Sequence, residues 1–576
     1  MTRRAKTDLA IAMAGLALLL LSAASVSAVT STSPQVTMRF AAGDGSATLT
    51  GVESTSSLDF LGIPFAEPPT GPRRFQPATP KSISSSEFNA TSFGAACPQP
   101  ACMHARQGCP ETYSEDCLFL NVFVPKGTAP KGGWPVFVWI HGGAFVEGTA
   151  SVSSWSESGV FANEGVMLVT ANYRLGALGW MAGGGLEGNY GLSDQREALR
   201  WVRDHIAAFG GDDSQITVGG ESAGAMSILA HIASPEAAGL FDAAIVESGT
   251  IALPYGTPTE PGTFLVELSR KLGCPQDGGG DVAACLRALS SEEINSTVTE
   301  MANPGSIVPV LLLEPMELAE PFYPTIGTAD LPLHPLRAFE EGKFNKVPLL
   351  IGQNQDEGAV FVDASLGAHP TKLGEVEAVL AKTFTPELSL QIRNQYPLWL
   401  HGGAKSSASD VLSRIATDYM FKGSSRKVAS EVSAAGLPVY AYIFDAGSGG
   451  VVSPWTPSPE DPALNPDQRK AAARHSKVCL GKVCHGAELP FVFGEIESAG
   501  KDEDFAVSRR ISDLWARFIK DPQAGVQPDW PAFDPEGQQW LTFSDSDPIL
   551  ANISTAGDAK LDFWDSVGYD FWKQRL

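Results

Sequence analysis

A serine lies between two glycines in the segment Gly220-Glu-Ser-Ala-Gly224, which matches the G-x-S-x-G pattern of serine nucleophiles. The pattern alone is weak, because a chain rich in glycine and serine can contain it in an incidental turn. Its context strengthens it here, since the apolar run 215–218 predicts a strand before the serine and 225–232 predicts a helix after it. A strand–turn–helix of this kind would expose the hydroxyl of Ser222 above a sheet, where it could attack a carbonyl carbon.

A serine hydroxyl needs a base, and the base needs a carboxylate to orient it. His485 lies in a glycine-containing loop late in the chain, and His475 is its rival by position. Asp356 and Glu357 follow the apolar run 347–351, so both are expected at the carboxyl end of a strand, where such sites lie. The spacing does not decide between these two acids.

A glycine loop could stabilise the negative charge that such an attack creates on the carbonyl oxygen. The segment His141-Gly-Gly-Ala-Phe145 directly follows the apolar run 134–140. Loops of this type point backbone N–H groups into an oxyanion hole, together with the N–H of the residue after the nucleophile, here Ala223. The alternative, an ordinary glycine turn, is disfavoured because this loop, the serine and the late histidine occur in the expected order.

The elements that must position these residues follow from continuous apolar runs, which are typical of strands buried on both faces. Between two of them, segment 193–209 carries apolar residues at helical spacing and predicts a crossover helix. The order strand, helix, strand predicts a doubly wound α/β sheet. Segment 252–345 is expected to form inserted helices and loops, and 445–470 a proline-rich loop. The expected strands cover 134–140, 166–172, 215–218, 347–351 and 439–444.

Composition limits the classes of protein to which the chain can belong. It has 576 residues, of which 43% are hydrophobic and 18% charged, and its 58 Gly and 41 Pro form no repeat. These values exclude collagen-like and disordered acidic proteins. The net charge of −24, with no local basic patch, argues against nucleic acid as a partner. We expect one large catalytic domain over residues 29–576.

The N-terminus has the order of a secretory signal peptide. Basic residues at positions 3, 4 and 6 precede an apolar run over 9–21, and small residues follow as far as Ala28. The run is shorter than the roughly 20 residues of a membrane span, which disfavours a retained anchor. We therefore expect cleavage of residues 1–28, with cleavage after Ala24 as the rival, and a secreted, extracellular protein without a stable membrane anchor.

Eight cysteines fit an oxidising compartment, where an even number indicates disulfides. Proximity pairs Cys274 with Cys285 and Cys479 with Cys484. The remaining four, which leave three connectivities open, are Cys97, Cys102, Cys109 and Cys117. Metal binding by these cysteines with His104 or His485 is disfavoured, because the spacings match no usual zinc pattern. On the secretory route, the sequons at Asn89, Asn295 and Asn552 would carry glycans on surface loops.

Taken together, these segments resemble the type-B carboxylesterase/lipase family, the α/β-hydrolase group that includes cholinesterases, fungal lipases and neuroligins. The resemblance implies an α/β-hydrolase fold, with a large, mostly parallel sheet covered by helices on both faces. It runs through most of the expected mature chain. The matching stretches are 60–69, 114–122, 172–176, 201–224, 356–358 and 485–494.

The resemblance also implies a role for each candidate residue. Ser222 would be the nucleophile, Glu357 rather than Asp356 the acid, and His485 the base. Gly143, Ala144 and Ala223 would donate to the oxyanion; Ala144 stands where the family has a third glycine and could narrow the acyl pocket. Neither a metal nor an organic cofactor is expected.

For the cysteines, the resemblance implies a bridge between Cys97 and Cys117, and it matches Cys274–Cys285 to a second family bridge. The other two expected bridges, Cys102–Cys109 and Cys479–Cys484, lie outside the family pattern, and the latter would fix the loop that carries His485. Arg74 and Glu115 match a structural ion pair of the family.

The loop between Cys97 and Cys117 narrows the expected substrate. It contains no Trp, which argues against choline esters, because cholinesterases hold the choline cation on such a ring. The loop is also short, which argues against a long lid that opens at lipid. We expect a small-molecule ester with a small to medium acyl chain. The alternatives are a lipase or sterol esterase acting on long-chain esters, and a catalytically silent adhesion or binding protein; the oligomeric state stays open.

Overall fold

The computed structural model describes most of the chain between residues 33 and 570. The described ranges are 33–39, 46–81, 85–99, 110, 112–152, 159–253, 255–257, 263–275, 281–301, 322–366, 373–396, 408–447, 469, 473, 477–496, 501–537, 539–545, 553–555 and 559–570. Several predictions fall outside these ranges: the signal peptide 1–28, Cys102, Cys109, His475 and Asn552.

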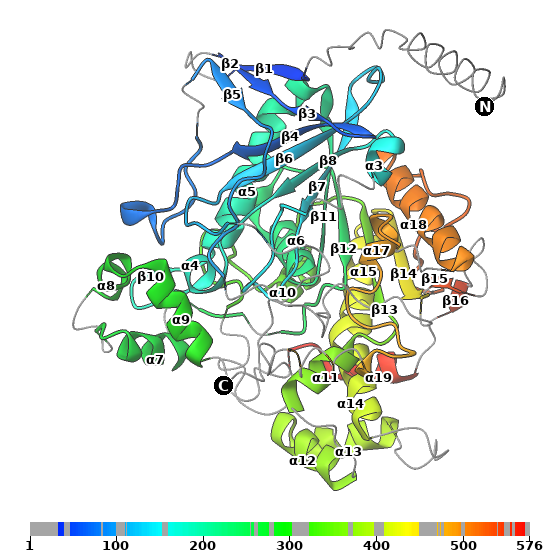
Figure 1. Ribbon diagram of the computed structural model, residues 1–576. Coiled ribbons are helices and arrows are strands. Elements are labelled where there is room, and N and C mark those ends of the chain that lie inside the picture. The colour runs from blue at the N-terminus through cyan, green and yellow to red at the C-terminus, as the bar shows by residue number, and fades with distance from the viewer. Residues whose placement is uncertain are drawn as a thin grey trace, which may run out of the picture. The chain divides into compact units, whose positions relative to one another are not determined.

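An eleven-stranded sheet forms the centre of the structure (Figure 1). Its strands from β15 to β8 pair in parallel, and antiparallel strands lie at both edges. In spatial order the strands are β16 (Ile553–Thr555), β15 (Gln539–Ser544), β14 (Val439–Asp445), β13 (Leu349–Asn354), β12 (Ala243–Glu247), β11 (Gly211–Glu221), β7 (Trp134–Ile140), β8 (Met167–Ala171), β6 (Phe119–Pro125), β4 (Ser57–Pro64) and β3 (Val52–Glu53). The expected large, mostly parallel sheet is therefore confirmed.

Strand β7 shows why its residues form a central strand. Val136 and Val138 point into one buried cluster, whereas Phe137 and Trp139 point into the other. Successive side chains of a strand face opposite sides of the sheet, so a strand covered on both sides must be apolar throughout. This is the continuous apolar run that the sequence shows at this position.

Helices cover both faces of the sheet (Figure 1). The cluster that contains Val136 includes residues of α5 (Tyr190–His205), α6 (Ala223–Ala233), α10 (Pro335–Glu340) and α15 (Ser424–Ala434). The cluster that contains Phe137 includes residues of α3 (Val160–Asn163), α17 (Leu489–Val492) and α18 (Asp502–Lys520). The chain thus forms the three layers expected of a doubly wound fold.

Further elements lie around this core. The expected insertion after residue 252 contains α7 to α9, which Figure 1 shows as a group beside the sheet. The bounds of the remaining elements are β1 (Gln35–Arg39), β2 (Ser46–Thr50), β5 (Glu87–Asn89), β9 (Ala182–Gly183), β10 (Leu186–Glu187), α4 (Gly176–Trp180), α7 (Thr263–Lys271), α8 (Val282–Ala288), α9 (Ser291–Met301), α11 (Gly358–Leu366), α12 (Leu373–Thr383), α13 (Pro386–Gln395), α14 (Ala408–Ala416), α19 (Ala559–Val567), the 3-10 helices η2 (Gly71–Arg73), η3 (Ile206–Phe209) and η4 (Pro235–Ala237), and the π-helix η6 (Thr417–Gly423).

Several expected elements differ in their bounds from the structure; the strand expected over 347–351, for example, is β13 (Leu349–Asn354). The helix expected over 193–209 is α5 followed by η3, and β11 begins at Gly211 rather than at Gln215. The first residues of β11 are polar, so hydropathy hides them, but Gly211 already pairs with Trp134 of β7. Gln35–Leu576 form one compact unit, while a domain boundary at residue 29 stays a prediction.

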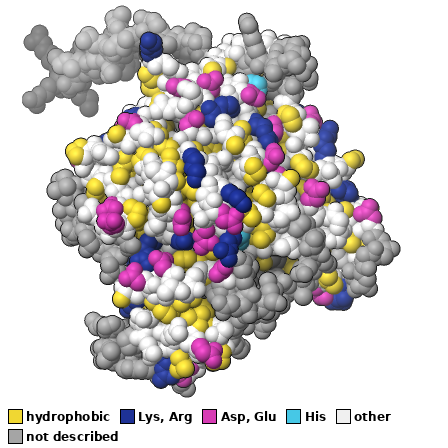
Figure 2. Space-filling model, turned by 180° about the vertical axis from the view of Figure 1, so that it is seen from behind, with side chains coloured by type: hydrophobic (Ala, Val, Ile, Leu, Met, Phe, Trp, Pro, Cys, Tyr) yellow, Lys and Arg dark blue, Asp and Glu magenta, His cyan; other side chains and the backbone are white. Residues whose placement is uncertain are grey.

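The surface agrees with the mixed charge of the sequence. On the face shown in Figure 2, Lys and Arg side chains are interspersed with Asp and Glu. Among the described helices, none combines the length and the apolar character that crossing a membrane requires.

Candidate active site

Ser222 occupies a sharp turn between β11 and α6. Its backbone has φ 57° and ψ −122°, a combination that residues with a side chain rarely adopt and that is characteristic of functional turns. The turn brings α6 so close to β7 that a Cβ on Gly224 would lie 2.1 Å from the carbonyl oxygen of Ile140. Glycine at position 224 therefore lets the turn form, as the sequence motif predicts.

The parallel register brings the carboxyl ends of four strands together. In β7 and β11, Ile140 pairs with Gly220, and β12 then pairs with β11 through Glu247 and Glu221. Strand β13 follows β12 at the same edge. Segments that are far apart in the sequence, at the ends of β7 (Ile140) and β11 (Glu221) and after β13 (Asn354), thus meet beside the serine turn.

His485 and Glu357 form a direct pair in this region. Nδ1 of His485 lies 2.5 Å from Oε2 of Glu357, and both side chains are buried. An ionised carboxylate can only accept, so Nδ1 keeps its proton and Nε2 is the nitrogen that acts as the base once the ring is neutral. The other oxygen of Glu357 accepts from the hydroxyl of Ser248 at 2.5 Å and from the backbone N–H of Asn354 at 2.7 Å.

The adjacent acid, Asp356, has different partners. Its Oδ2 accepts from the backbone N–H of Val483 at 3.1 Å, and its own N–H donates to the carbonyl oxygen of Val483 at 2.9 Å. Spacing in the sequence does not decide which of the two carboxylates faces the histidine. In the structure, Glu357 bonds to His485, whereas Asp356 bonds to the backbone of Val483, two residues before His485.

Three further buried glutamates surround this pair, and sequence reasoning missed all of them. Oε1 of Glu221 lies 3.2 Å from Nε2 of His485, while Glu488 accepts a short hydrogen bond from the side chain of Asn354. Glu247 accepts from the indole N–H of Trp515 at 2.8 Å. Glu221 directly precedes Ser222 and Glu488 lies three residues after His485, so their places in the two motifs could have pointed to them.

This charge distribution changes the proton affinities of the site. Burial alone would lower the pKa of His485. The negative charges of Glu357, Glu221 and Glu488 outweigh this effect and raise the pKa to about 9. Burial, together with the charge of Glu357, raises the pKa of Glu488 to about 7. Burial and the charge of Glu488 raise the pKa of Glu247 well above its usual range. The site therefore favours a positively charged imidazole.

The expected oxyanion loop follows β7 in a tight turn. The N–H groups of Val146 and Glu147 both donate to the carbonyl oxygen of Gly143, at 2.9 and 3.1 Å. Gly143 has φ 108°, and a Cβ there would lie 2.1 Å from the carbonyl oxygen of Glu147, so only glycine fits. Ala144 has φ 50°, a strained value for alanine. Ala223 is the first residue of α6, so its N–H has no acceptor within the helix.

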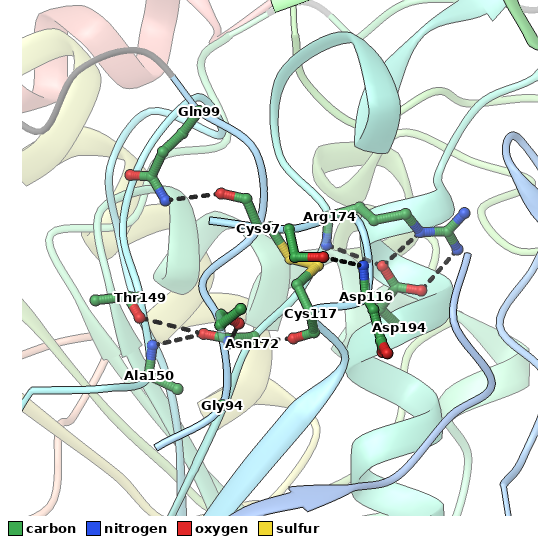
Figure 3. The surroundings of a disulfide bond; sticks show 12 residues. Gly94, Cys97, Gln99, Asp116, Cys117, Thr149, Ala150, Asn172, Arg174 and Asp194 are labelled. Atoms are coloured by element: carbon green, nitrogen blue, oxygen red, sulfur yellow. Dashed lines mark hydrogen bonds and ion pairs between the residues drawn. A yellow bond between two sulfur atoms is a disulfide. The ribbon is translucent and has the colours of Figure 1, made fainter. Parts of the chain in front are cut away.

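The disulfide between Cys97 and Cys117 lies near the segment that follows this loop, of which Figure 3 shows Thr149 and Ala150. Gln99, two residues after the first cysteine, donates to the carbonyl oxygen of Gly148 at 2.9 Å and accepts from its N–H at 3.0 Å. Asn172 joins the carbonyl oxygen of Cys117, at 3.1 Å, to the N–H of Ala150, at 2.8 Å (Figure 3). The segment around the disulfide thus holds Gly148 and Ala150, which follow the oxyanion loop.

Two aromatic rings pack against the imidazole. The ring centroids of Phe361 in α11 and Phe421 in η6 lie 4.8 and 5.5 Å from that of His485, and the two rings stack on each other at 5.6 Å. These rings give the site an apolar wall next to the base.

The remaining expected features have mixed outcomes. Cys97–Cys117, Cys274–Cys285 and Cys479–Cys484 are bonded, and Arg74 forms a close ion pair with Glu115. The two described sequons do not lie in loops: Asn89 is exposed on β5, and Asn295 is half-buried on α9. The expectation of surface loops at these two positions is therefore wrong, because hydropathy did not reveal that short strand and that amphipathic helix.

Comparison with known proteins identifies relatives over nearly the whole chain. Residues 32–564 match the sequence pattern of the family described as "Carboxylesterase family". The para-nitrobenzyl esterase of Bacillus subtilis (strain 168) is 32% identical over 85% of this chain and 92% of its own length. The "Crystal protein" of Dictyostelium discoideum is 32% identical over 89% of this chain and 88% of its own. A solved PNB esterase structure superimposes with a TM-score of 0.72, at 28% identity, covering 92% of this chain and 99% of that one.

Proposed function

Because the chain belongs to the carboxylesterase family and is a carboxylic ester hydrolase, we propose that it cleaves its ester through an acyl-enzyme on Ser222. The observation that carries this proposal is the pair of His485 and Glu357, whose imidazole lies 3.2 Å from Glu221, the residue directly before Ser222. A nucleophile, a base and an orienting acid are the groups that this chemistry needs.

In the first half of the reaction, Nε2 of His485 takes the hydroxyl proton of Ser222 while Oγ bonds to the acyl carbon. The carbonyl oxygen becomes an oxyanion that accepts from the N–H groups of Gly143, Ala144 and Ala223. When the carbon–oxygen bond to the alcohol breaks, the alcohol leaves with the proton from His485. Water then gives a proton to the same nitrogen and attacks the acyl carbon. When the bond from this carbon to Oγ breaks, Oγ takes the proton from His485, the acid leaves and Ser222 is restored.

Glu357 and Glu221 both favour the imidazolium that forms in each half-reaction. Glu357 fixes the ring through Nδ1, and Glu221 places a second carboxylate 3.2 Å from Nε2. Opposite charges at this distance in a buried site stabilise the charged ring more than they would in water. The same stabilisation makes the free enzyme harder to deprotonate, so activity should require alkaline pH.

The substrate is an ester with a small to medium acyl chain. The methyl group of Ala144 reduces the space beside the oxyanion donors, and Phe361 and Phe421 offer an apolar surface next to His485. The name of the Bacillus relative points to an aromatic ester, which such rings could contact. A lipase or sterol esterase would use the same chemistry on long chains, and a binding protein would lack turnover.

The protein is secreted after removal of residues 1–28 and carries glycans. Three bonded disulfides support an oxidising compartment. Asn89 is exposed and is therefore the better placed of the two described sequons. Secretion is tested by searching for the mature N-terminus in the culture medium.

Hydrolysis of p-nitrophenyl esters from acetate to palmitate tests the proposed specificity, with Ser222→Ala as the matched control. The highest kcat/KM is expected between acetate and octanoate, with turnover lost in the variant. A maximum at palmitate would identify a lipase instead. A folded protein without turnover on any ester would favour the binding protein.

A further inference from the structure

Hydrogen bonds join the loop that carries the acid to the loop that carries the base, at positions just before Glu357 and His485. Asp356 directly precedes Glu357, and Val483 lies two residues before His485. The N–H of Asp356 donates to the carbonyl oxygen of Val483 at 2.9 Å, and the N–H of Val483 donates to Oδ2 of Asp356 at 3.1 Å. This two-bond contact, the 356–483 clamp, spans 127 residues of sequence.

The loop on the histidine side of the clamp is closed by a disulfide. Cys479 and Cys484 flank Val483, and the N–H of Lys482 donates to the carbonyl oxygen of Cys479 at 3.0 Å, which makes a tight turn. Val483 and Cys484 are both buried, so this end of the turn packs against the protein, whereas Leu480 within the turn is exposed. A disulfide that joins cysteines only five positions apart in the sequence leaves the chain between them few conformations, which fixes the backbone that leads into His485.

The loop on the acid side is fixed as well. Ala359, in the first turn of α11, packs with Val478, Cys479 and Cys484 in a small apolar cluster apart from the two main ones. The disulfide therefore contacts the helix that begins directly after Glu357. Both ends of the Glu357–His485 hydrogen bond thus depend on one small block of structure.

We propose that Asp356 is a positioning residue, which together with the Cys479–Cys484 disulfide holds Glu357 and His485 at hydrogen-bonding distance. This inference rests on the proposed function of that pair. The carboxylate acts as a hydrogen-bond acceptor for a backbone N–H, so an amide oxygen can replace it. The residue touches neither the substrate nor the reacting atoms.

The test compares Asp356→Ala, which removes the acceptor, with Asp356→Asn, which keeps an oxygen in the same place. The matched control is Gln355→Ala, which removes the neighbouring side chain, an acceptor for Lys422. On p-nitrophenyl butyrate, we expect Asp356→Ala to lose about 10- to 100-fold in kcat with little change in KM, because small misplacements are costly. Asp356→Asn and Gln355→Ala should stay within about 3-fold of the wild type.

The pH profile gives a readout that general destabilisation would not change. A looser Glu357–His485 contact gives the imidazole less support, so the acid limb of kcat/KM should move to lower pH in Asp356→Ala. Unchanged kcat and an unchanged acid limb in the folded variant would overturn the proposal. A loss of kcat in Asp356→Asn as large as in Asp356→Ala would also overturn the proposal. The charge of the carboxylate would then matter, and not its role as a hydrogen-bond acceptor.

The disulfide is tested by replacing both of its cysteines with serine, and the same change at Cys274 and Cys285 is the control. The 479/484 variant should resemble Asp356→Ala, while the folded 274/285 variant should keep wild-type kcat. If the 479/484 variant does not fold, the kinetics of Asp356→Ala still test the positioning role of Asp356. If both folded double variants keep kcat, the disulfide has no positioning role.

A spectroscopic readout separates this proposal from the proposed function. The shared proton between Nδ1 of His485 and Glu357 should give a far-downfield NMR resonance, assigned by its loss in His485→Gln. The resonance should weaken in Asp356→Ala and persist in Asp356→Asn, whether or not the protein hydrolyses any ester. If the resonance kept its full strength in Asp356→Ala, the positioning role of the 356–483 clamp would be refuted. The proposed function would still stand as long as turnover is lost in Ser222→Ala.

Discussion

Oε1 of Glu221 lies 3.2 Å from Nε2 of His485, while Glu357 lies 2.5 Å from Nδ1 of the same ring. One buried imidazole thus has a buried carboxylate at each nitrogen. Burial lowers the pKa of His485, but these charges raise it to a net value of about 9. The base of the reaction is therefore a strong one that is protonated at neutral pH.

The acid limb of kcat/KM should consequently lie near pH 9 in the wild type, because His485 must lose its proton to act as a base. Glu221→Gln removes one of the charges that stabilise the imidazolium, so the limb should move to lower pH. The measurement is a pH–rate profile beside Glu236→Gln, a change at an exposed residue that should leave the limb unchanged. An unshifted limb in Glu221→Gln would show that this carboxylate does not act on His485.

Glu357→Gln should reduce kcat by about 10³- to 10⁴-fold, because the amide no longer selects the tautomer with its proton on Nδ1. Asp356→Asn at the adjacent position is the matched control and should keep near-wild-type turnover. Steady-state kinetics compare kcat of the two variants, and thermal unfolding checks that both are folded. Equal losses in the two variants would remove the distinction between these acids.

Gly143→Ala and Ala144→Gly should have opposite effects, although they exchange the same two residue types. The first places a Cβ 2.1 Å from the carbonyl oxygen of Glu147, so it should cost about 2 kcal/mol or more of stability and abolish most turnover. The second removes a Cβ at φ 50° and keeps the N–H, so activity should stay within about 3-fold. Denaturant unfolding and kcat measure both effects. A well-folded, active Gly143→Ala variant would contradict the oxyanion assignment.

Gln99→Met should lower kcat by about 10-fold and leave KM nearly unchanged, because it releases Gly148, three residues after the oxyanion loop. The control is Gln76→Met, the same change at an exposed position. Initial rates over a range of substrate concentrations separate kcat from KM. A rise in KM alone would indicate that Gln99 shapes binding rather than the transition state.

Much of this site can be predicted from sequence, because its chemistry depends on local motifs. The turn at Ser222 needs a strand, two glycines and a helix within about 20 residues, and each leaves a pattern in the sequence. The apolar runs similarly predict the parallel strands, since both of their faces are buried.

The rest depends on how distant segments meet. Asp356 and Glu357 follow the same strand, so spacing alone cannot tell which one faces His485. The contacts of the folded chain separate them, because Glu357 bonds to His485 and Asp356 to Val483. The grouping of Glu221, Glu247 and Glu488 depends on strand register and a late loop, neither of which a local pattern contains.

The central claim is that Ser222 forms an acyl-enzyme, and trapping that intermediate tests it most directly. The protein is mixed with excess p-nitrophenyl butyrate and quenched in acid within milliseconds, and its peptides are weighed by mass spectrometry. The account predicts one butyryl group on the peptide that contains Ser222, and none on any peptide of Ser222→Ala. A butyryl group on another residue, or rapid turnover by Ser222→Ala, would contradict it.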